Sequence, residues 1–255
     1  MKSARLNKME EYIRDRQTVS LKELQDTFDL SINTVRRYIT VLLDRNPEFQ
    51  KVYGGICVNA PKESSPSSPE DGRTISCVAE KQRSCQYAAT LIQPHDIVYI
   101  DNGTSTSYIP MYLPDAMPLT IITNSVRIIN GVIDKPSITL VVLPGILNRT
   151  TLSFTGENCS RQLETYNIQK AFLSCVGFSL NAGATNFSIE EYKIKSTAAQ
   201  RADQIILLAD HTKIGHNTLM TYCPTSRIDL LVTDKDPGPE YTEAFLQYNH
   251  AIAVV

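Results

Sequence analysis

The stretch Val19–Arg37, VSLKELQDTFDLSINTVRR, predicts two short helices joined by a tight turn. Ser20 and Glu23 fit a capping box, in which the serine hydroxyl satisfies a free amide and the glutamate reaches back, so a helix is expected to begin there. Leu24 and Phe28 then continue one apolar helical face. The next two residues break that pattern, which indicates a turn before a second helix.

The second helix is expected to start after a cap at Ser31. Its residues Val35, Ile39 and Leu42 repeat on one face, and such a stripe needs neighbours to bury it. Upstream residues supply a third apolar face: Leu6, Met9 and Ile13. Residues 3–44 therefore predict a three-helix unit whose last helix can enter the major groove of DNA.

The face opposite the apolar stripe carries Asn33, Arg37 and Thr40, flanked by Thr34 and Arg36. Arginine pairs with guanine or with phosphate, and asparagine pairs with adenine. An isolated Arg-Arg pair is usually only part of a solvated helix face. The cap, the turn and the three-helix context favour DNA contact over that alternative.

Two short strands are expected on either side of Gly54-Gly55, because both glycines tolerate the positive φ of a tight hairpin. Lys51 and Tyr53 on this hairpin are expected to meet phosphate or the minor groove. The alternative is a hairpin that only covers the helices. The predicted DNA-contacting residues are Ser31, Asn33, Thr34, Arg36, Arg37, Thr40, Lys51 and Tyr53.

Charge is distributed unevenly along the 255 residues, although the net charge is only −2. Residues 1–60 carry ten Lys/Arg against eight Asp/Glu, or +2, which leaves fifteen against nineteen, or −4, for the rest. This sign suits DNA binding by the head alone. Affinity would then depend on local placement of charge and on assembly into a homo-oligomer.

Cysteine and histidine spacing indicates no metal site. The six cysteines form no C-x-x-C pair and the four histidines complete no ligand pattern, so reduced thiols and no metal or other cofactor are expected. The chain begins without an apolar signal core and has no run of about 18 apolar residues, which predicts a cytoplasmic protein that does not enter the membrane.

Residues 59–76 have the composition of a flexible linker, with three prolines, five serines and one glycine. They separate a predicted DNA-binding domain, 1–58, from a second domain, 77–255. The length and the 42% hydrophobic content allow a small head and one larger globular domain.

Beyond residue 76, short apolar runs alternate with helical patterns. Strands are expected at 97–100, 119–123, 138–143, 171–176, 205–209, 230–233 and 251–255. Helices are expected at 77–92, 105–113, 125–133, 157–166, 188–201 and 239–248. Continuous apolar strands separated by helices predict an α/β fold with a mostly parallel sheet covered on both faces.

Small polar loops follow several of these strands, where ligands of parallel sheets bind. The loop 101–106, DNGTST, can cradle a phosphate with amides and hydroxyls. Taken singly, these segments are typical of structural caps or solvated faces, but together they predict a site for a phosphorylated sugar or polyol. The predicted effector-binding residues are Asp101, Gly103, Thr104, Ser105, Thr106, Thr123, Asn124, Ser125, Glu191, Lys195, Asp210 and Lys213.

The head and these loops share motifs with a known family. The segments at 19–21, 34–37 and 52–55 resemble the winged-helix head of DeoR-family bacterial transcription regulators, although Tyr38 stands where the family usually has aspartate. The family's D-x-G-T-T-T, T-N-S, E-E-x-x-x-K and D-x-x-K-F-G segments resemble those at 101–106, 123–125, 190–195 and 210–215. Pro144-Gly145 replaces the usual Gly-Gly. The resemblance implies a winged helix-turn-helix head and an α/β effector domain similar to ribose-5-phosphate isomerase.

Within the family, the segments 52–56, 166–172 and 207–211 look most like repressors of myo-inositol catabolism. This resemblance implies a cytoplasmic homo-oligomeric repressor that binds double-stranded operator DNA and responds to a phosphorylated intermediate of inositol breakdown. Deoxyribose phosphate or a hexose phosphate remains open as the inducer.

Two other classes of protein are considered. An isomerase-like enzyme could use Asp101, Glu191 or Asp210 as base and Lys195 or Lys213 as electrophile, but a DNA-reading head and a linker suit a sensor better. A pure protein-interaction module would leave the polar strand-end loops unexplained.

Overall fold

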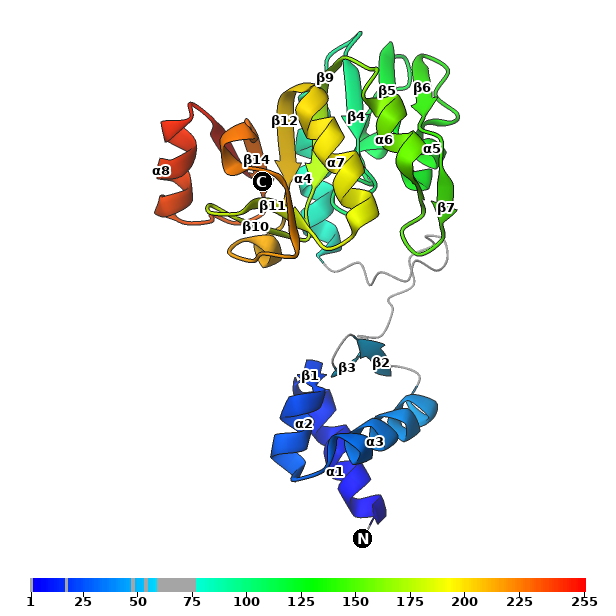
Figure 1. Cartoon of the computed structure of the whole chain (residues 1–255), viewed down its shortest axis with the longest axis vertical. Helices are drawn as coiled ribbons and strands as arrows, with labels where there is room; N and C mark the ends of the chain where they lie inside the picture. The colour runs from blue at the N-terminus through cyan, green and yellow to red at the C-terminus, as the bar shows by residue number, and fades with distance from the viewer. Residues whose placement is uncertain (1, 17, 47–48, 53–54, 59–76) are drawn as a thin grey trace. The chain divides into compact units, whose positions relative to one another are not determined.

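The computed structural model describes residues 2–16, 18–46, 49–52, 55–58 and 77–255, and the chain divides into two compact units, Met1–Pro69 and Glu70–Val255 (Figure 1). Each unit is described by itself. The predicted linker 59–76 falls outside the described residues, so its boundaries with the two domains stay predictions.

The first unit is a winged helix-turn-helix, as expected. Its elements are α1 (Lys2–Arg16), β1 (Thr18–Ser20), α2 (Leu21–Phe28), α3 (Ile32–Arg45), β2 (Phe49–Val52) and β3 (Gly55–Val58). The strands form an antiparallel sheet in the order β1-β3-β2. The predicted apolar faces of the three helices meet in one core, which Val19, Phe49 and Ile56 of the sheet complete.

Both helices begin where the sequence predicts, and each has a side-chain cap at its first turn. The hydroxyl of Ser20 accepts a hydrogen bond from the Glu23 amide at 3.1 Å, and that of Ser31 accepts from the Thr34 amide at 3.3 Å. The reciprocal half of the capping box is replaced, since the Glu23 carboxylate accepts from the Tyr12 hydroxyl at 3.1 Å. Asp29 ends α2 in the left-handed conformation, with φ of 48°. This residue forms the tight turn between α2 and α3 and so sets the direction in which α3 begins.

The second unit is built on a seven-stranded parallel sheet in the order β15-β14-β12-β9-β4-β5-β6. Its strands are β4 (Ile97–Ile100), β5 (Leu119–Thr123), β6 (Ile138–Val142), β9 (Ile168–Ser174), β12 (Ala202–Leu208), β14 (Leu230–Thr233) and β15 (Ala251–Val254). The chain runs outward from β4 to β6 and then returns to β9 on the other side of β4. The topological switch point therefore lies between β4 and β9.

Helices cover both faces of this sheet, as the buried strands require. One face packs against α4 (Val78–Thr90), the 3₁₀ helix η1 (Ile109–Tyr112) and α5 (Val126–Val132). The other face packs against α6 (Glu157–Leu163), α7 (Ile189–Arg201) and α8 (Pro239–Gln247), and Figure 1 shows α7 crossing in front of the strands. Successive residues of β4 and β12 alternate between the two apolar cores, which is the period-2 pattern of a strand.

The structure departs from the sequence prediction in several places. Strand β1 was not predicted, and β9 and β12 each begin three residues earlier than expected. The helix expected at 105–113 is wrong over its first half, where turns precede η1, because Thr106 and Ser107 donate their hydroxyl protons to backbone carbonyls three residues earlier. Two small antiparallel sheets were also not predicted. They comprise β7 (Ile146–Asn148) with β8 (Ser153–Thr155), and β10 (Gly177–Ser179) with β11 (Gly183–Asn186) and β13 (Met220–Cys223).

Candidate functional site

The exposed face of α3 presents the predicted DNA-contacting side chains together. Val35, Ile39 and Leu42 are buried, and the opposite face exposes Asn33, Arg36, Arg37 and Thr40. Thr34 is half-buried because its hydroxyl contacts that of Ser31 at 2.9 Å. Ser31 and Thr34 thus have a structural role at the cap that is independent of any DNA contact.

Tyr38, which stands where the family usually has aspartate, contacts the neighbouring Arg37. The guanidinium of Arg37 lies 5.9 Å from the Tyr38 ring centroid, within cation–π range. Such a contact restrains the arginine while leaving its N–H groups free to donate. Tyr53 and the side chain of Lys51 lie outside the described residues, so wing contact with DNA stays a prediction.

In the second unit, the predicted effector residues gather at the carboxyl ends of the strands. Asp101 follows β4, Thr123 ends β5 and Asp210 comes two residues after β12, and Ser174, which was not predicted, ends β9 between them. These strands are the central members of the sheet and flank the switch point between β4 and β9. Parallel sheets bind their ligands in this position.

Asp101 and Lys195 form a buried ion pair, with side-chain exposures of 0% and 3%. One Asp101 oxygen accepts from the Lys195 ammonium and from the Ser174 amide and hydroxyl, at 2.7 and 2.8 Å from the latter two. The other accepts from the Gly103 amide and the Thr106 hydroxyl. The carboxylate is therefore saturated by the chain itself.

The electrostatics of the pair agree with this arrangement. Burial alone would raise the pKa of Asp101, but the Lys195 charge and hydrogen bonds from Lys195, Thr106 and Gly103 outweigh it and hold the pKa below its ordinary value. Lys195 also donates to the Ser174 carbonyl at 2.7 Å and lies 5.5 Å from the Tyr222 ring centroid. Asp101 and Lys195 thus shape the loop after β4, and their direct contact with an effector stays a prediction.

The loop 101–106 has backbone amides that Asp101 does not bind. Within the described chain, the amides of Thr104 and Ser105 donate to no acceptor, whereas the Gly103 amide is taken by Asp101. Consecutive free amides in a turn form a concavity that attracts anions. The Thr104 side chain is half-buried beside them. This loop has the donors that a phosphate group needs.

Glu191 lies in a polar network that spans several elements. Its two carboxylate oxygens accept from the side-chain amides of Asn102 at 3.0 Å and Asn186 at 2.7 Å. Asn102 also donates to the Ser153 hydroxyl at 3.2 Å, and Thr151 contacts that hydroxyl at 2.6 Å. The network ties the first loop to β8, β11 and α7.

The segment 123–125 is buried and internally bonded. The Thr123 hydroxyl donates to the Ile100 carbonyl at 2.7 Å, and Ser125 caps α5 through the Ile128 amide at 3.4 Å. The Asn124 side chain accepts from Tyr99 and donates to the Phe154 carbonyl. These contacts give the segment a supporting role beside the loop 101–106, and its direct effector contact stays a prediction.

Asp210 faces a lysine that the sequence analysis did not select. One Asp210 oxygen accepts from the amide and hydroxyl of Thr212. The other lies 3.9 Å from the Lys81 ammonium on α4, and both side chains are almost fully buried. Burial lowers the pKa of Lys81, the Asp210 charge opposes that shift, and the Lys213 charge adds to it. Two lysines and one aspartate thus meet at the end of β12.

His211 and Asp234 clamp the loop that carries these groups. The Asp234 carboxylate accepts from the His211 amide at 2.6 Å, and its second oxygen lies 2.6 Å from the imidazole Nδ1. Burial would raise the pKa of Asp234, but the hydrogen bonds from His211 outweigh it and lower that pKa. The end of β12 is thereby fixed to the end of β14.

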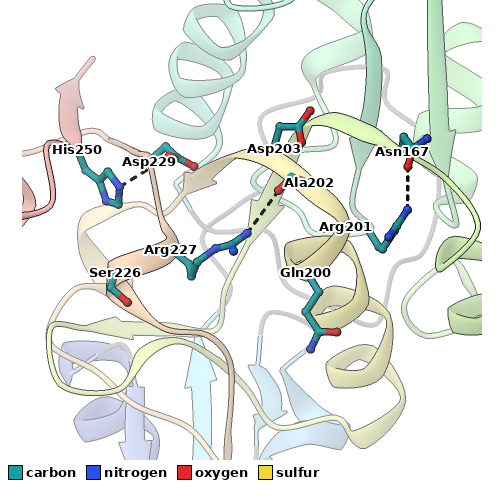
Figure 2. Close-up of a pocket in the computed structure, with 9 residues that line it drawn as sticks. All are labelled: Asn167, Gln200, Arg201, Ala202, Asp203, Ser226, Arg227, Asp229 and His250. Carbon is teal, nitrogen blue, oxygen red and sulfur yellow. Dashed lines mark hydrogen bonds and ion pairs between the residues drawn. The ribbon is translucent and has the colours of Figure 1, made fainter.

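A separate open pocket of about 720 Å³ lies at the amino ends of β9, β12, β14 and β15, the opposite edge of the sheet (Figure 2). Its arginines are engaged with the backbone: Arg227 donates to the Ala199 carbonyl at 3.1 Å, and Arg201 donates to the Tyr166 carbonyl at 3.0 Å. Asp229 accepts from the Ile205 amide at 2.7 Å. These charged groups secure helix and strand ends.

Comparison with known proteins agrees with both units. A model of the DeoR-like helix-turn-helix domain matches residues 5–62, and a model of the DeoR C-terminal sensor domain matches residues 76–235. The chain belongs to the DeoR family. The HTH-type transcriptional regulator IolR of Bacillus subtilis (strain 168) is 41% identical over 243 residues, covering 95% of each chain.

More distant DeoR relatives match over similar lengths. The deoxyribose operon repressor of Escherichia coli (strain K12) is 26% identical and covers 94% of this chain and 93% of its own. Among solved structures, a D-ribose-5-phosphate isomerase in complex with phospho-erythronic acid aligns with a TM-score of 0.39 at 14% identity, over 55% of each chain. That last likeness is a distant one.

Two side chains of the candidate site, Lys81 and Ser174, have no signature in the sequence. Lys81 appears as one charge on an ordinary helix, and only its burial against Asp210 distinguishes it. Ser174 lies within a predicted strand, yet it bonds both partners of the Asp101–Lys195 pair. Its position directly after an apolar run, at a strand end, is the signal that could have selected it.

Proposed function

We propose that this chain is a DNA-binding repressor that a phosphorylated sugar or polyol releases from its operator. The observation that supports DNA binding is the exposed face of α3, where Arg36 and Arg37 project away from a packed three-helix core. Arginines on a recognition helix read guanine or hold phosphate. Operator DNA with two-fold symmetry would then require at least a homodimer.

The observation that supports a phosphorylated inducer is the pair of free amides at Thr104 and Ser105. A phosphate bound there lies at the switch point of the sheet, and Lys213 after β12 and Lys81 on α4 supply positive charge on the same edge. The supporting contacts of Asp101, Lys195 and Glu191 keep the loop in its binding shape. The chain thus offers charge, amides and hydroxyls to one ligand.

We infer that the inducer comes from inositol breakdown. The segments 166–172 and 207–211 resemble those of inositol repressors, and identity to IolR is 41% against 26% for the deoxyribose operon repressor. An isomerase-like enzyme is the weaker candidate, because Asp101 and Lys195 neutralise each other and are saturated. The matched relatives are named as regulators and repressors.

Thermal unfolding with a panel of ligands tests the inducer class. A ligand that binds only the folded state raises the melting temperature. We expect one sugar or inositol phosphate to raise it and its unphosphorylated parent not to do so, and we expect Lys213→Ala to reduce the shift. A shift produced only by free polyols or nucleosides would contradict the phosphate assignment.

A further inference from the structure

Strand β15 forms one edge of the parallel sheet, and in the described chain it pairs with β14 alone. The amide of Ala251 donates inward to the Asp229 carbonyl at 3.0 Å, and that of Val255 donates inward to the end of β14 at 2.9 Å. Alternate residues of a strand direct their backbone groups to opposite sides. Ile252 and Val254 therefore direct their N–H and C=O groups away from the sheet.

The side chains along this edge are apolar and partly exposed. β15 contains neither a charged residue nor a proline, and the exposed fraction of Val254 is 54%. Leu246 and Tyr248, in the helix and the turn that lead into the strand, are 68% and 48% exposed. Edge strands of natural proteins are normally protected from pairing by charges, prolines, bulges or a covering element. The sequence of β15 provides no such protection.

The opposite edge of the same sheet does have protecting residues. Pro136 and Pro144 flank β6, and Lys135 comes shortly before it. Proline cannot donate to a strand ladder, and a lysine is costly to place against a second strand, so both residue types limit pairing at β6. The contrast between the two edges indicates that β15 is the edge available to another strand.

A second copy of β15 fits this edge. Two copies related by a two-fold axis through Ala253 run antiparallel, so Ile252 of each lies opposite Val254 of the other. Residues opposed in this way exchange both of their backbone hydrogen bonds, and the two pairs use every outward donor and acceptor of both strands. The strand is uncharged, so its copies meet without repulsion, and Ala253 leaves room for its own copy on the axis.

We propose that two copies of this chain dimerise by antiparallel pairing of their β15 strands, which joins the sheets of two sensor domains. Backbone hydrogen bonds alone do not offset the entropy lost on association, so burial of exposed apolar side chains such as Val254 adds to them. A contact of this kind is isologous and closed, which gives dimers rather than fibres. It supplies two-fold symmetry for two heads on one operator, and it does not depend on the identity of the inducer.

Disulfide cross-linking of the full chain tests the position of the axis. Ala253→Cys should form a disulfide-linked dimer on mild oxidation, because opposed residues of its type have Cα atoms about 4.5 Å apart, within disulfide range. Ile252→Cys and Val254→Cys lie diagonal to their own copies, about 7–8 Å away, and should cross-link at least about fivefold less. A non-reducing gel measures the dimer fraction.

Two controls belong to this experiment. All variants carry Cys57→Ser and Cys77→Ser, because the other four cysteines are buried and cannot cross-link two copies. Val141→Cys is the matched control on the opposite edge. It lies in the middle of β6 as Ala253 does in β15, and it should stay monomeric on the gel.

Analytical ultracentrifugation measures the association itself. We expect the parent to sediment as a dimer, and Val254→Lys to weaken dimerisation at least about tenfold, because it places a charge at the paired edge. Val254→Pro should do the same, since it deletes an amide that only the partner strand would use. Val142→Lys, at a residue of β6 that is 42% exposed, is the matched control and should keep the dimer. Circular dichroism checks that each variant is folded.

A parent that stays monomeric at about 100 μM would overturn the inference, as would a dimer that both Val254 variants leave intact. Cross-linking at Ile252→Cys or Val254→Cys in preference to Ala253→Cys would also overturn the pairing. A β15 dimer that binds no operator DNA would leave the pairing standing and contradict the proposed function. Operator binding and release by a chain that does not pair through β15 would leave the proposed function standing and refute the pairing.

Discussion

Arg36 and Arg37 carry the DNA-binding prediction at the scale of single residues. Arg36→Ala and Arg37→Ala should each weaken operator binding by about 1–3 kcal/mol, roughly five- to 150-fold, because each removes a contact to base or phosphate. Fluorescence anisotropy of labelled operator measures this. Lys8→Ala, an equal charge change at an exposed position on α1, is the control. Parent-like affinity in both arginine variants would show that α3 is not the recognition helix.

Salt dependence separates the two kinds of arginine contact. A variant that loses a phosphate contact should reduce the slope of log K against log salt by about 0.9, whereas loss of a base contact should leave the slope unchanged. Because Arg37 stacks on Tyr38, we expect Arg37→Ala and Arg36→Ala to differ in this slope. Identical slopes in parent and both variants would exclude phosphate contact by either arginine.

The buried Asp101–Lys195 pair makes acid stability a residue-scale property. The folded pKa of Asp101 is lowered, so its contribution to stability is present above the unfolded pKa of about 4 and is lost as the pH falls through the lower folded value. The free energy of unfolding of the sensor domain should therefore decrease below about pH 4. Urea unfolding at a series of pH values measures this.

Lys195→Met should lower the free energy of unfolding by about 3–5 kcal/mol, because it leaves the Asp101 carboxylate buried without its cation. This loss should become smaller at low pH, because without the Lys195 charge burial raises the pKa of Asp101 relative to the parent, and protonation then removes the buried charge. Lys193→Met, an exposed lysine on the same helix, should leave stability and pH dependence unchanged. Equal stability of the two variants would contradict a structural role for the ion pair.

At the scale of elements, the loop after β4 depends on one glycine. A Cβ at Gly103 would lie 1.7 Å from the Ser174 hydroxyl oxygen, which is itself bonded to Asp101 and Lys195. Gly103→Ala should therefore displace the loop, destabilise the domain by about 1–3 kcal/mol and weaken phosphate binding. Thermal unfolding with and without inorganic phosphate measures both effects. An unchanged midpoint and phosphate shift would refute the loop geometry.

Elements with strong periodicity or clear caps could be predicted from the sequence. The starts of α2 and α3 follow from Ser20 and Ser31, and the seven strands of the parallel sheet follow from their apolar runs. The prediction of a helix at 105–113 failed because hydroxyls in a loop compete with the backbone for hydrogen bonds. The strands β7, β8 and β10 have only three residues each, and β11 and β13 lack the continuous apolar run that marks β4.

Residues of the candidate site could be predicted only where they lie in a sequence motif. Loops at strand ends follow from topology, so the sequence predicts Asp101 and Asp210 as site residues. Which of them is saturated and which has a free oxygen depends on tertiary contacts, and the same holds for the burial of Lys81. The sequence therefore predicts where the candidate site lies, and the structure shows which of its side chains are bonded within the chain.

At the scale of the whole molecule, the head and the sensor domain must be coupled for induction to occur. A ligand shifts an equilibrium only through different affinities for the two states, and a coupling of about 1–3 kcal/mol is typical. In the described residues no helix is long and apolar enough to span a bilayer. Coupling is expected to act within a homo-oligomer that holds two heads on one operator.

Operator release is the most direct test of this account. Anisotropy of an operator fragment, selected by the full chain from genomic DNA, would be followed during titration with sugar and inositol phosphates. We predict that one phosphorylated compound weakens operator binding by about five- to 150-fold, and that Lys213→Ala binds the operator normally but is not released. Operator affinity that no phosphorylated compound alters, or release that persists in Lys213→Ala, would contradict the account.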